Sequence, residues 1–113
     1  MASKEKHIQK YNKNKQVFNS ELFNIENNFD WKVTIIFYAA VHLIEGSIDG
    51  KTKCTSHKDR YDIVNRSFRK IIDDYENLYK LSKKARYNCV KIKEYEVDSA
   101  LMSLRQIESN ISV

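Results

Sequence analysis

Proline is absent from the chain, and glycine occurs only twice, as Gly46 and Gly50. A sheet of many strands needs turn-forming residues at each hairpin, so this scarcity argues against such a fold. Cysteine is equally scarce, with only Cys54 and Cys89. Two cysteines are too few for the disulfide framework of a small secreted domain, and reduced thiols are the simpler expectation.

The sequence also lacks a hydrophobic run long enough to span a bilayer. Its most apolar stretch, residues 33–48, is interrupted by His42 and Glu45 and is shorter than the roughly 20 residues that a spanning helix needs. The first residues are polar and rich in lysine, without the apolar core of a secretory signal. We therefore expect a cytoplasmic protein with no contact with a membrane.

The length and composition that remain are those of one folded domain. With 113 residues, of which 42% are hydrophobic and 31% charged, the chain is large enough for one core and too small for two. We expect a single domain over residues 1–113.

Apolar residues recur at the helical spacing of three and four in four segments. The predicted segments are residues 8–29, residues 31–48, a segment from Ser56 to Tyr79, and a segment from Lys93 to Ile111. Asp30 and Ser56 can cap the second and third segments by accepting a backbone N–H hydrogen bond in the first turn. We expect a break in the third segment near residues 73–74. The second segment is the most apolar, which places it at the centre of an all-α, antiparallel four-helix bundle.

The charge of the chain favours an anionic partner. The formal net charge is +5, and residues 80–93 contain six basic residues and no acidic one. Two tyrosines, Tyr79 and Tyr87, lie in or beside this basic segment, and such a mixture suits phosphate contact combined with base stacking. A second lysine run, residues 4–15, is typical of a solvated helix face.

His42 is a polar residue within the most apolar segment, on one helical stripe with Tyr38 and Glu45. One interpretation is a core histidine whose hydrogen bonds are satisfied by Glu45 or by a facing helix. The other is a general acid or base that Glu45 orients, because the pKa of histidine lies near neutral pH.

His57 and Arg60 share a face at the start of the third segment, where free N–H groups and an arginine can hold an anion. The alternative places His57 in the helix cap and Arg60 in a surface ion pair with Asp59, Asp62 or a neighbouring helix. Cys54 and His57 have the spacing of half a zinc site, but no second pair completes it, so we predict no metal. Glycine-rich phosphate loops and nucleophile elbows are absent from the sequence, and no cofactor is predicted.

Three sequence pieces together resemble small bacterial proteins of the HEPN superfamily (higher eukaryotes and prokaryotes nucleotide-binding). They are the segment DWKVTIIFYAAVHLIE of residues 30–45, the pair His57-x-x-Arg60, and the stretch from Tyr75 to Ala85-Arg86-Tyr87. The resemblance implies a helical bundle that commonly pairs as a homodimer and occurs in toxin–antitoxin, phage-defence and RNA-processing systems. Many members are metal-independent ribonucleases.

The chain departs from the ribonuclease hallmark of that superfamily, an arginine followed after four to six residues by a histidine. After Arg86 the corresponding residues are Lys91, Ile92 and Lys93. Whether the protein is an enzyme therefore stays open.

Two functions remain. The first is a binding and dimerisation module that contacts RNA, a nucleotide or a protein partner such as an antitoxin. Its expected contact residues are Arg60, Lys83, Lys84, Arg86 and Tyr87. The second is a metal-independent endoribonuclease in which His42 or His57 takes a proton from an RNA 2′-hydroxyl and Arg60 or Arg86 stabilises the phosphorane charge.

Overall fold

The computed structural model describes residues 3–19, 29–48, 56–87 and 91–111, and all regular structure within these ranges is helical. The elements are α1 (Lys4–Asn19), α2 (Phe29–Ser47), α3 (His57–Ser67), the 3-10 helix η2 (Arg69–Ile71), α4 (Ile72–Tyr87) and α5 (Glu94–Asn110). The predicted all-α class is confirmed. The helices of the described chain are more numerous than the expected four because the third predicted segment is divided.

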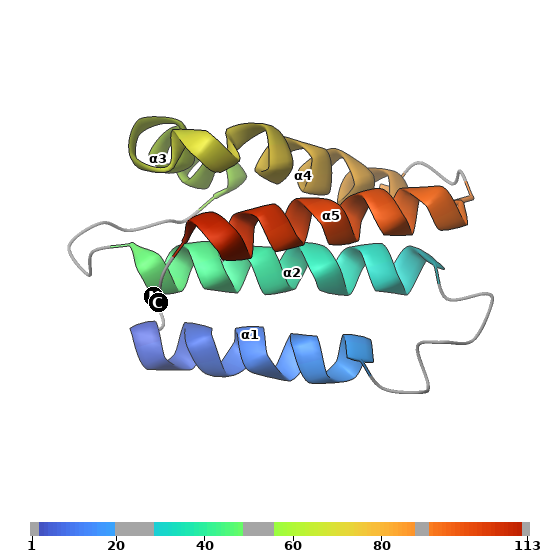
Figure 1. Cartoon of the computed structure of the whole chain (residues 1–113), viewed down its shortest axis with the longest axis horizontal. Helices are drawn as coiled ribbons and strands as arrows, with labels where there is room; N and C mark the ends of the chain where they lie inside the picture. Colours follow the sequence, from blue (N-terminus) through green and yellow to red (C-terminus); the bar gives the residue numbers. More distant parts are fainter. Residues whose placement is uncertain (1–2, 20–28, 49–55, 88–90, 112–113) are drawn as a thin grey trace.

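Helix α2 is the central element. It contacts α1 on one side and both α4 and α5 on the other, as Figure 1 shows. The colours of Figure 1 also show that the chain reverses direction between α1 and α2 and again between α4 and α5, while α3 lies at one end of α4. The central position predicted for the most apolar segment is therefore confirmed.

The core of the described residues is a single cluster built mainly from α2, α4 and α5, to which α3 adds Val64 and η2 adds Ile71. Its largest fully buried side chain is Tyr75 of α4, and Leu78 and Leu104 lie close to complete burial beside it. From α2 the buried members are Val33, Ile36, Phe37, Ala39, Ala40, Val41, Leu43 and Ile44. Residues on all sides of α2 are buried, which is the pattern of a helix surrounded by others.

Gly46 allows α1 to approach α2 closely near its end. A Cβ atom at this position would lie 2.7 Å from Cδ1 of Ile8 and 3.7 Å from Cβ of His7. Real Cβ atoms do not approach other carbons to 2.7 Å, so a side chain here requires Ile8 to move. The glycine thereby positions His7 against α2.

Two boundaries differ from the sequence-based expectation. Phe29 begins α2 and does not belong to the first predicted helix. Helix α1 is described as far as Asn19, and residues 20–28 of that predicted segment lie outside the described residues. Asp30 lies in the first turn of α2 and is not its cap; its backbone carbonyl accepts a hydrogen bond from Thr34 Oγ1 at 2.8 Å. Ser56 is confirmed as the cap of α3, because its hydroxyl accepts from the backbone N–H of Asp59 at 3.1 Å.

The break in the third segment lies at Phe68–Ile71 and not near residues 73–74. Phe68 leaves the helical conformation, with φ −134° and ψ 48°, and the 3-10 turn follows. Asp73 and Asp74 instead occupy the first turn of α4. Negative side chains are favourable there because the helix dipole is positive at the N-terminus. These aspartates therefore support the start of a helix.

The last predicted helix is confirmed as α5, with Val97, Ala100, Leu104 and Ile107 buried. Its start is fixed by Glu96, whose carboxylate accepts the backbone N–H of Lys93 at 3.0 Å. None of the described helices is both long and apolar enough to cross a membrane.

Candidate functional site

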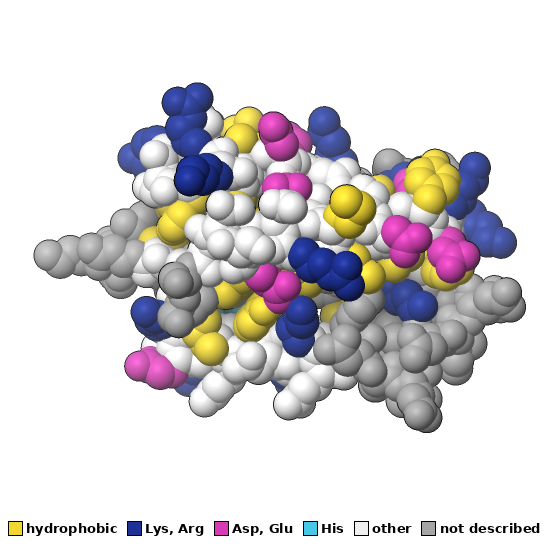
Figure 2. Space-filling model, in the orientation of Figure 1, with side chains coloured by type: hydrophobic (Ala, Val, Ile, Leu, Met, Phe, Trp, Pro, Cys, Tyr) yellow, Lys and Arg dark blue, Asp and Glu magenta, His cyan; other side chains and the backbone are white. Residues whose placement is uncertain are grey.

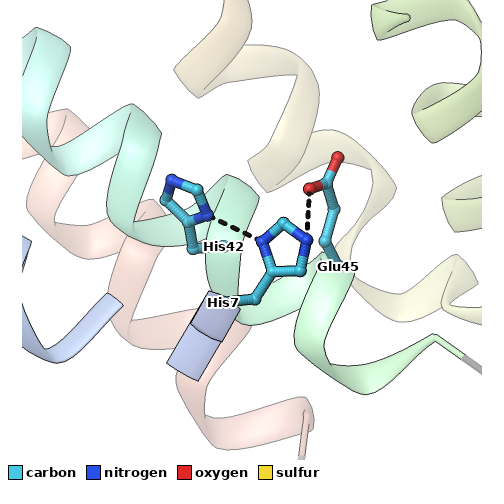
Figure 3. Close-up of side chains that lie close together, drawn as sticks. All are labelled: His7, His42 and Glu45. Carbon is cyan, nitrogen blue, oxygen red and sulfur yellow. Dashed lines mark hydrogen bonds and ion pairs between the residues drawn. The ribbon is translucent and has the colours of Figure 1, made fainter. Parts of the chain in front are cut away.

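Three polar side chains meet between α1 and α2, as Figure 3 shows. His7 of α1 lies between the two α2 residues: its Nδ1 is 2.9 Å from Nδ1 of His42, and its Nε2 is 3.3 Å from Oε2 of Glu45. His7 is 7% exposed. One of the two facing Nδ1 atoms must carry a proton for the contact to be a hydrogen bond.

Glu45 of α2 also contacts a residue of α3. Its Oε1 accepts hydrogen bonds from Nε of Arg60 at 3.1 Å and from Nη2 at 2.9 Å. The side chains of Glu45 and Arg60 are 9% and 15% exposed, so little water competes for either charge. Removing one partner of such a pair leaves the other charge buried and uncompensated.

Tyr75 of α4 joins Arg60 to His57. Arg60 Nη1 donates to the tyrosine hydroxyl at 3.4 Å, and Nδ1 of His57 lies 2.7 Å from the same oxygen. The His57 ring stacks on Tyr79, with ring centroids 3.3 Å apart and planes 5° from parallel. The residues of this polar network, in order of contact, are His42, His7, Glu45, Arg60, Tyr75 and His57.

Two histidines of the polar network have lowered pKa values. Burial is the main cause for His42, and the positive charges around it, on His7 when protonated, Lys10 and Arg60, lower its pKa further against the opposing effect of Glu45. Burial also lowers the pKa of His57, and Arg60 adds to the effect. Both imidazoles are therefore neutral at pH 7.

These shifts predict that the protein loses stability as the pH falls below about 6.5, the ordinary pKa of histidine. In the unfolded chain His42 and His57 take up protons from that pH downward, whereas in the folded protein they do so only at lower pH. The unfolded state then holds more protons, so the free energy of unfolding decreases with falling pH.

Urea unfolding at about pH 7.5 and about pH 5.5 measures this difference, with His42→Gln/His57→Gln as the matched variant. Between these two pH values the free energy of unfolding of the double variant is expected to decrease less than that of the original protein. An equal decrease in both proteins would assign the pH dependence to other groups.

A cavity of about 450 Å³ borders the histidine pair. It is lined by Lys6, His7, Gln9, Lys10, Lys13 and His42. Three lysines of the N-terminal run therefore line a hollow as well as facing solvent. His7 and His42 belong both to this cavity and to the polar network, so an anion in the cavity would meet the network at the histidine pair.

A second candidate surface lies on α4. The Arg86 guanidinium donates to the Tyr38 hydroxyl at 3.1 Å, and its central carbon lies 5.0 Å from the Tyr87 ring centroid and 5.8 Å from those of Phe37 and Tyr38. One turn earlier, Lys83 Nζ lies 5.5 Å from the Tyr79 ring centroid. We call Tyr38, Lys83, Arg86 and Tyr87 the α4 surface.

Positive charge alone does not locate a site. Figure 2 shows Lys and Arg side chains at several separate places on one face of the molecule, with acidic side chains between them. The α4 surface differs from a plain basic patch because cations and aromatic rings alternate on it.

The predicted site residues fall into two groups. His42, His57 and Arg60 are joined through the polar network, whereas Arg86 contacts Tyr38 and the neighbouring rings, none of which belongs to that network. Two predicted anion-binding cations are engaged by carboxylates: Arg60 by Glu45 and Lys84 by Glu96, whose Oε2 lies 2.8 Å from Lys84 Nζ.

Two of the predicted site residues contact a neighbouring helix, which was one of the alternatives for each. Glu45 does not hold His42 directly, because His7 lies between them; His42 is bonded to a facing helix, as the alternative interpretation had it. Arg60 pairs with Glu45 of α2, which is the neighbouring-helix alternative.

His7 is the residue that the sequence-based reasoning missed. The apolar series of the first predicted segment begins at Ile8, and His7 lies within the lysine run of residues 4–15. Tyr11 lies one turn after His7, and this spacing was the available signal that His7 shares the buried side. Tyr11 itself donates a hydrogen bond to Glu108 of α5.

No protein-family model matches the chain, and no curated protein or solved structure matches it.

Proposed function

We propose that this protein is a HEPN-like module that binds RNA or a nucleotide, acts in the cytoplasm as a homodimer, and belongs to a toxin–antitoxin or phage-defence type system. The sequence pieces that resemble the superfamily support this proposal, since they fall on α2, α3 and α4 in the expected order. The antiparallel arrangement of successive helices is compatible with it.

The α4 surface is the proposed RNA contact, and one observation carries the assignment: the Arg86 guanidinium lies among aromatic rings of which Tyr87 is 66% exposed. A base can stack on the open face of that ring while the guanidinium and Lys83 contact the neighbouring phosphates. Tyr38, 38% exposed, extends the same surface onto α2. Stacking of this kind accepts any base, so we expect weak sequence preference for single-stranded RNA.

Arg60 and Lys84 were predicted to contact RNA, but we do not assign that contact to them. Both are held by carboxylates, and an arginine that already donates two hydrogen bonds to Glu45 would lose them on turning to a phosphate. Direct contact with RNA is therefore assigned to Lys83, Arg86 and Tyr87.

Tyr87→Ala is expected to weaken binding of a single-stranded RNA oligonucleotide by about 5- to 160-fold, the effect of losing one stacked base worth about 1–3 kcal/mol. Arg86→Gln is expected to weaken binding and to reduce its salt dependence, because one fewer phosphate is neutralised. Fluorescence anisotropy at several salt concentrations measures both. Tyr95→Ala is the control, since Tyr95 is 65% exposed on α5 and lies outside the α4 surface. Equal affinities for Tyr87→Ala and Tyr95→Ala would contradict the assignment.

The homodimer is proposed from the superfamily resemblance. Sedimentation equilibrium across micromolar concentrations tests it directly, and the mass of a single chain at every concentration would contradict this part of the proposal.

A metal-independent endoribonuclease is the second candidate, and the position of His42 favours it. This imidazole lines the cavity together with three lysines, and its lowered pKa keeps it neutral and able to accept a proton at pH 7. The lysines, and not Arg60, would then stabilise the charge of the phosphorane.

Cleavage of labelled RNA in the presence of EDTA tests this second function. Loss of cleavage in His42→Ala, with cleavage retained in His57→Ala, would support it. Cleavage that survives His42→Ala, or no cleavage by the unmodified protein, would exclude His42 as the base.

A further inference from the structure

The cluster of His7, His42 and Glu45 has the composition of a metal site. Each residue offers one ligand atom, and the three atoms lie within 4.8 Å of one another. We propose that these residues bind one divalent transition-metal ion of the Zn²⁺ class. This inference goes beyond the proposed RNA binding and does not depend on it, since the cluster lies between α1 and α2 and includes no residue of the α4 surface.

The donor types favour Zn²⁺ over a hard cation. Two imidazoles and one carboxylate are a common three-ligand set for zinc sites that keep a fourth position open, whereas Mg²⁺ and Ca²⁺ prefer oxygen ligands throughout. Zinc bonds of about 2.0–2.1 Å place tetrahedral ligand atoms about 3.3 Å apart. The 3.3 Å between His7 Nε2 and Glu45 Oε2 matches this spacing. The 2.9 Å contact of His42 is with the other ring nitrogen of His7, so the His42 imidazole has to turn toward the same point to complete the site.

His7 supplies the second observation. Its Nε2 is buried and, among the described residues, has no hydrogen-bond partner. The atom lies 3.3 Å from Oε2 of Glu45, which counts as ion-pair distance, but the two groups are not aligned for a hydrogen bond. A buried polar atom without a partner is unfavourable because it has lost its hydrogen bonds to water. A metal ion between the ring nitrogen and the carboxylate would satisfy both.

Arg60 fixes the orientation of the Glu45 carboxylate. It holds Oε1 of Glu45 through two hydrogen bonds, which leaves Oε2 directed at His7. Metal-ligating carboxylates are normally fixed in this way by a residue behind them.

The fourth coordination position would face the cavity, because His7 and His42 both line it. Lys6, Lys10 and Lys13 line the same cavity, and positive charge near a cation is unfavourable unless an anion joins them. We therefore infer that the fourth ligand is an anionic oxygen, such as that of a phosphate group.

Isothermal titration of the EDTA-treated, dialysed protein with ZnCl₂ tests the site. The titration is made in a Cys54→Ser/Cys89→Ser background, which removes thiolates that bind zinc themselves. One equivalent per chain is expected to bind, and His42→Gln in the same background is expected to weaken the affinity at least tenfold. His57→Gln is the matched control, because it removes a histidine outside the cluster. Inorganic phosphate is expected to tighten zinc binding in the unmodified cluster and not in His42→Gln.

Two further measurements protect the test against variants that unfold. Circular dichroism checks the helical content of each variant, and Co²⁺ bound in place of Zn²⁺ is expected to give the visible absorption of a four-coordinate site. Absence of stoichiometric zinc binding, or equal affinities in the unmodified cluster and a folded His42→Gln variant, would overturn the proposal. So would loss of binding in His57→Gln alone.

Discussion

Glu45→Ala is expected to lower the free energy of unfolding by about 3–5 kcal/mol, because it leaves the Arg60 guanidinium buried without a counter-charge. The side chain of Arg60 is 15% exposed, so water can replace little of the lost interaction. His7 loses its carboxylate neighbour in the same variant. Urea unfolding followed by circular dichroism measures the change.

Two variants separate the lost charge pair from a general effect of removing a glutamate. Glu5→Ala, at an exposed position of α1, is expected to change stability by less than about 0.5 kcal/mol. Glu45→Gln/Arg60→Met removes both charges and is expected to be more stable than Glu45→Ala, since no buried charge remains unpaired. A double variant no more stable than Glu45→Ala would show that the loss has another cause.

Tyr75→Ala is expected to lower the free energy of unfolding by about 3–5 kcal/mol, as much as Glu45→Ala. Tyr75 is fully buried and is the largest such side chain, so its removal leaves a cavity in the core of α2, α4 and α5. Its hydroxyl also joins Arg60 to His57. Thermal and urea unfolding report the combined effect.

Tyr75→Phe isolates the hydroxyl, because it keeps the ring and removes only the oxygen. We expect this variant to lower the free energy of unfolding by about 1–3 kcal/mol, because the buried groups that contact the hydroxyl lose their partner. Tyr95→Ala, which removes an exposed tyrosine, is expected to stay within about 0.5 kcal/mol of the original protein. Similar losses for Tyr75→Ala and Tyr95→Ala would contradict the burial of Tyr75.

Local patterns in the sequence were enough to predict most of the helical structure. The apolar face of α2 and the buried series of α5 follow from helical spacing, and the Ser56 cap follows from its hydroxyl at a helix start. The break at Phe68–Ile71 was misplaced because the apolar series continues through it without a change of period. Only the backbone angles of Phe68 reveal the interruption.

The contacts of the site were harder to predict because they join residues far apart in the chain. His7 and His42 are separated by 35 positions, and Tyr38 and Arg86 by 48. Helical spacing correctly indicated that His42 and Glu45 share a face, but it could not show that a residue of α1 would insert between them. It also could not show which residue of a neighbouring helix would pair with Arg60.

The residues expected to stabilise the fold are different from those proposed to contact RNA. The polar network, which includes three of the four residues expected to act together, ties α1, α2, α3 and α4 to one another and ends at the cavity through His42. The α4 surface presents its cations and rings to solvent. Variants of the network should therefore act first on stability, and variants of the α4 surface on RNA affinity with stability unchanged.

Ultraviolet crosslinking of the protein to a uridine-rich single-stranded RNA, followed by mass spectrometry of the crosslinked peptides, tests the RNA-binding proposal most directly. We predict crosslinks in the peptides that contain Tyr38 or Tyr87, and their loss in Tyr87→Ala. Crosslinks confined to the lysine-lined cavity of α1, or none at RNA concentrations that saturate binding, would contradict the assignment of the α4 surface.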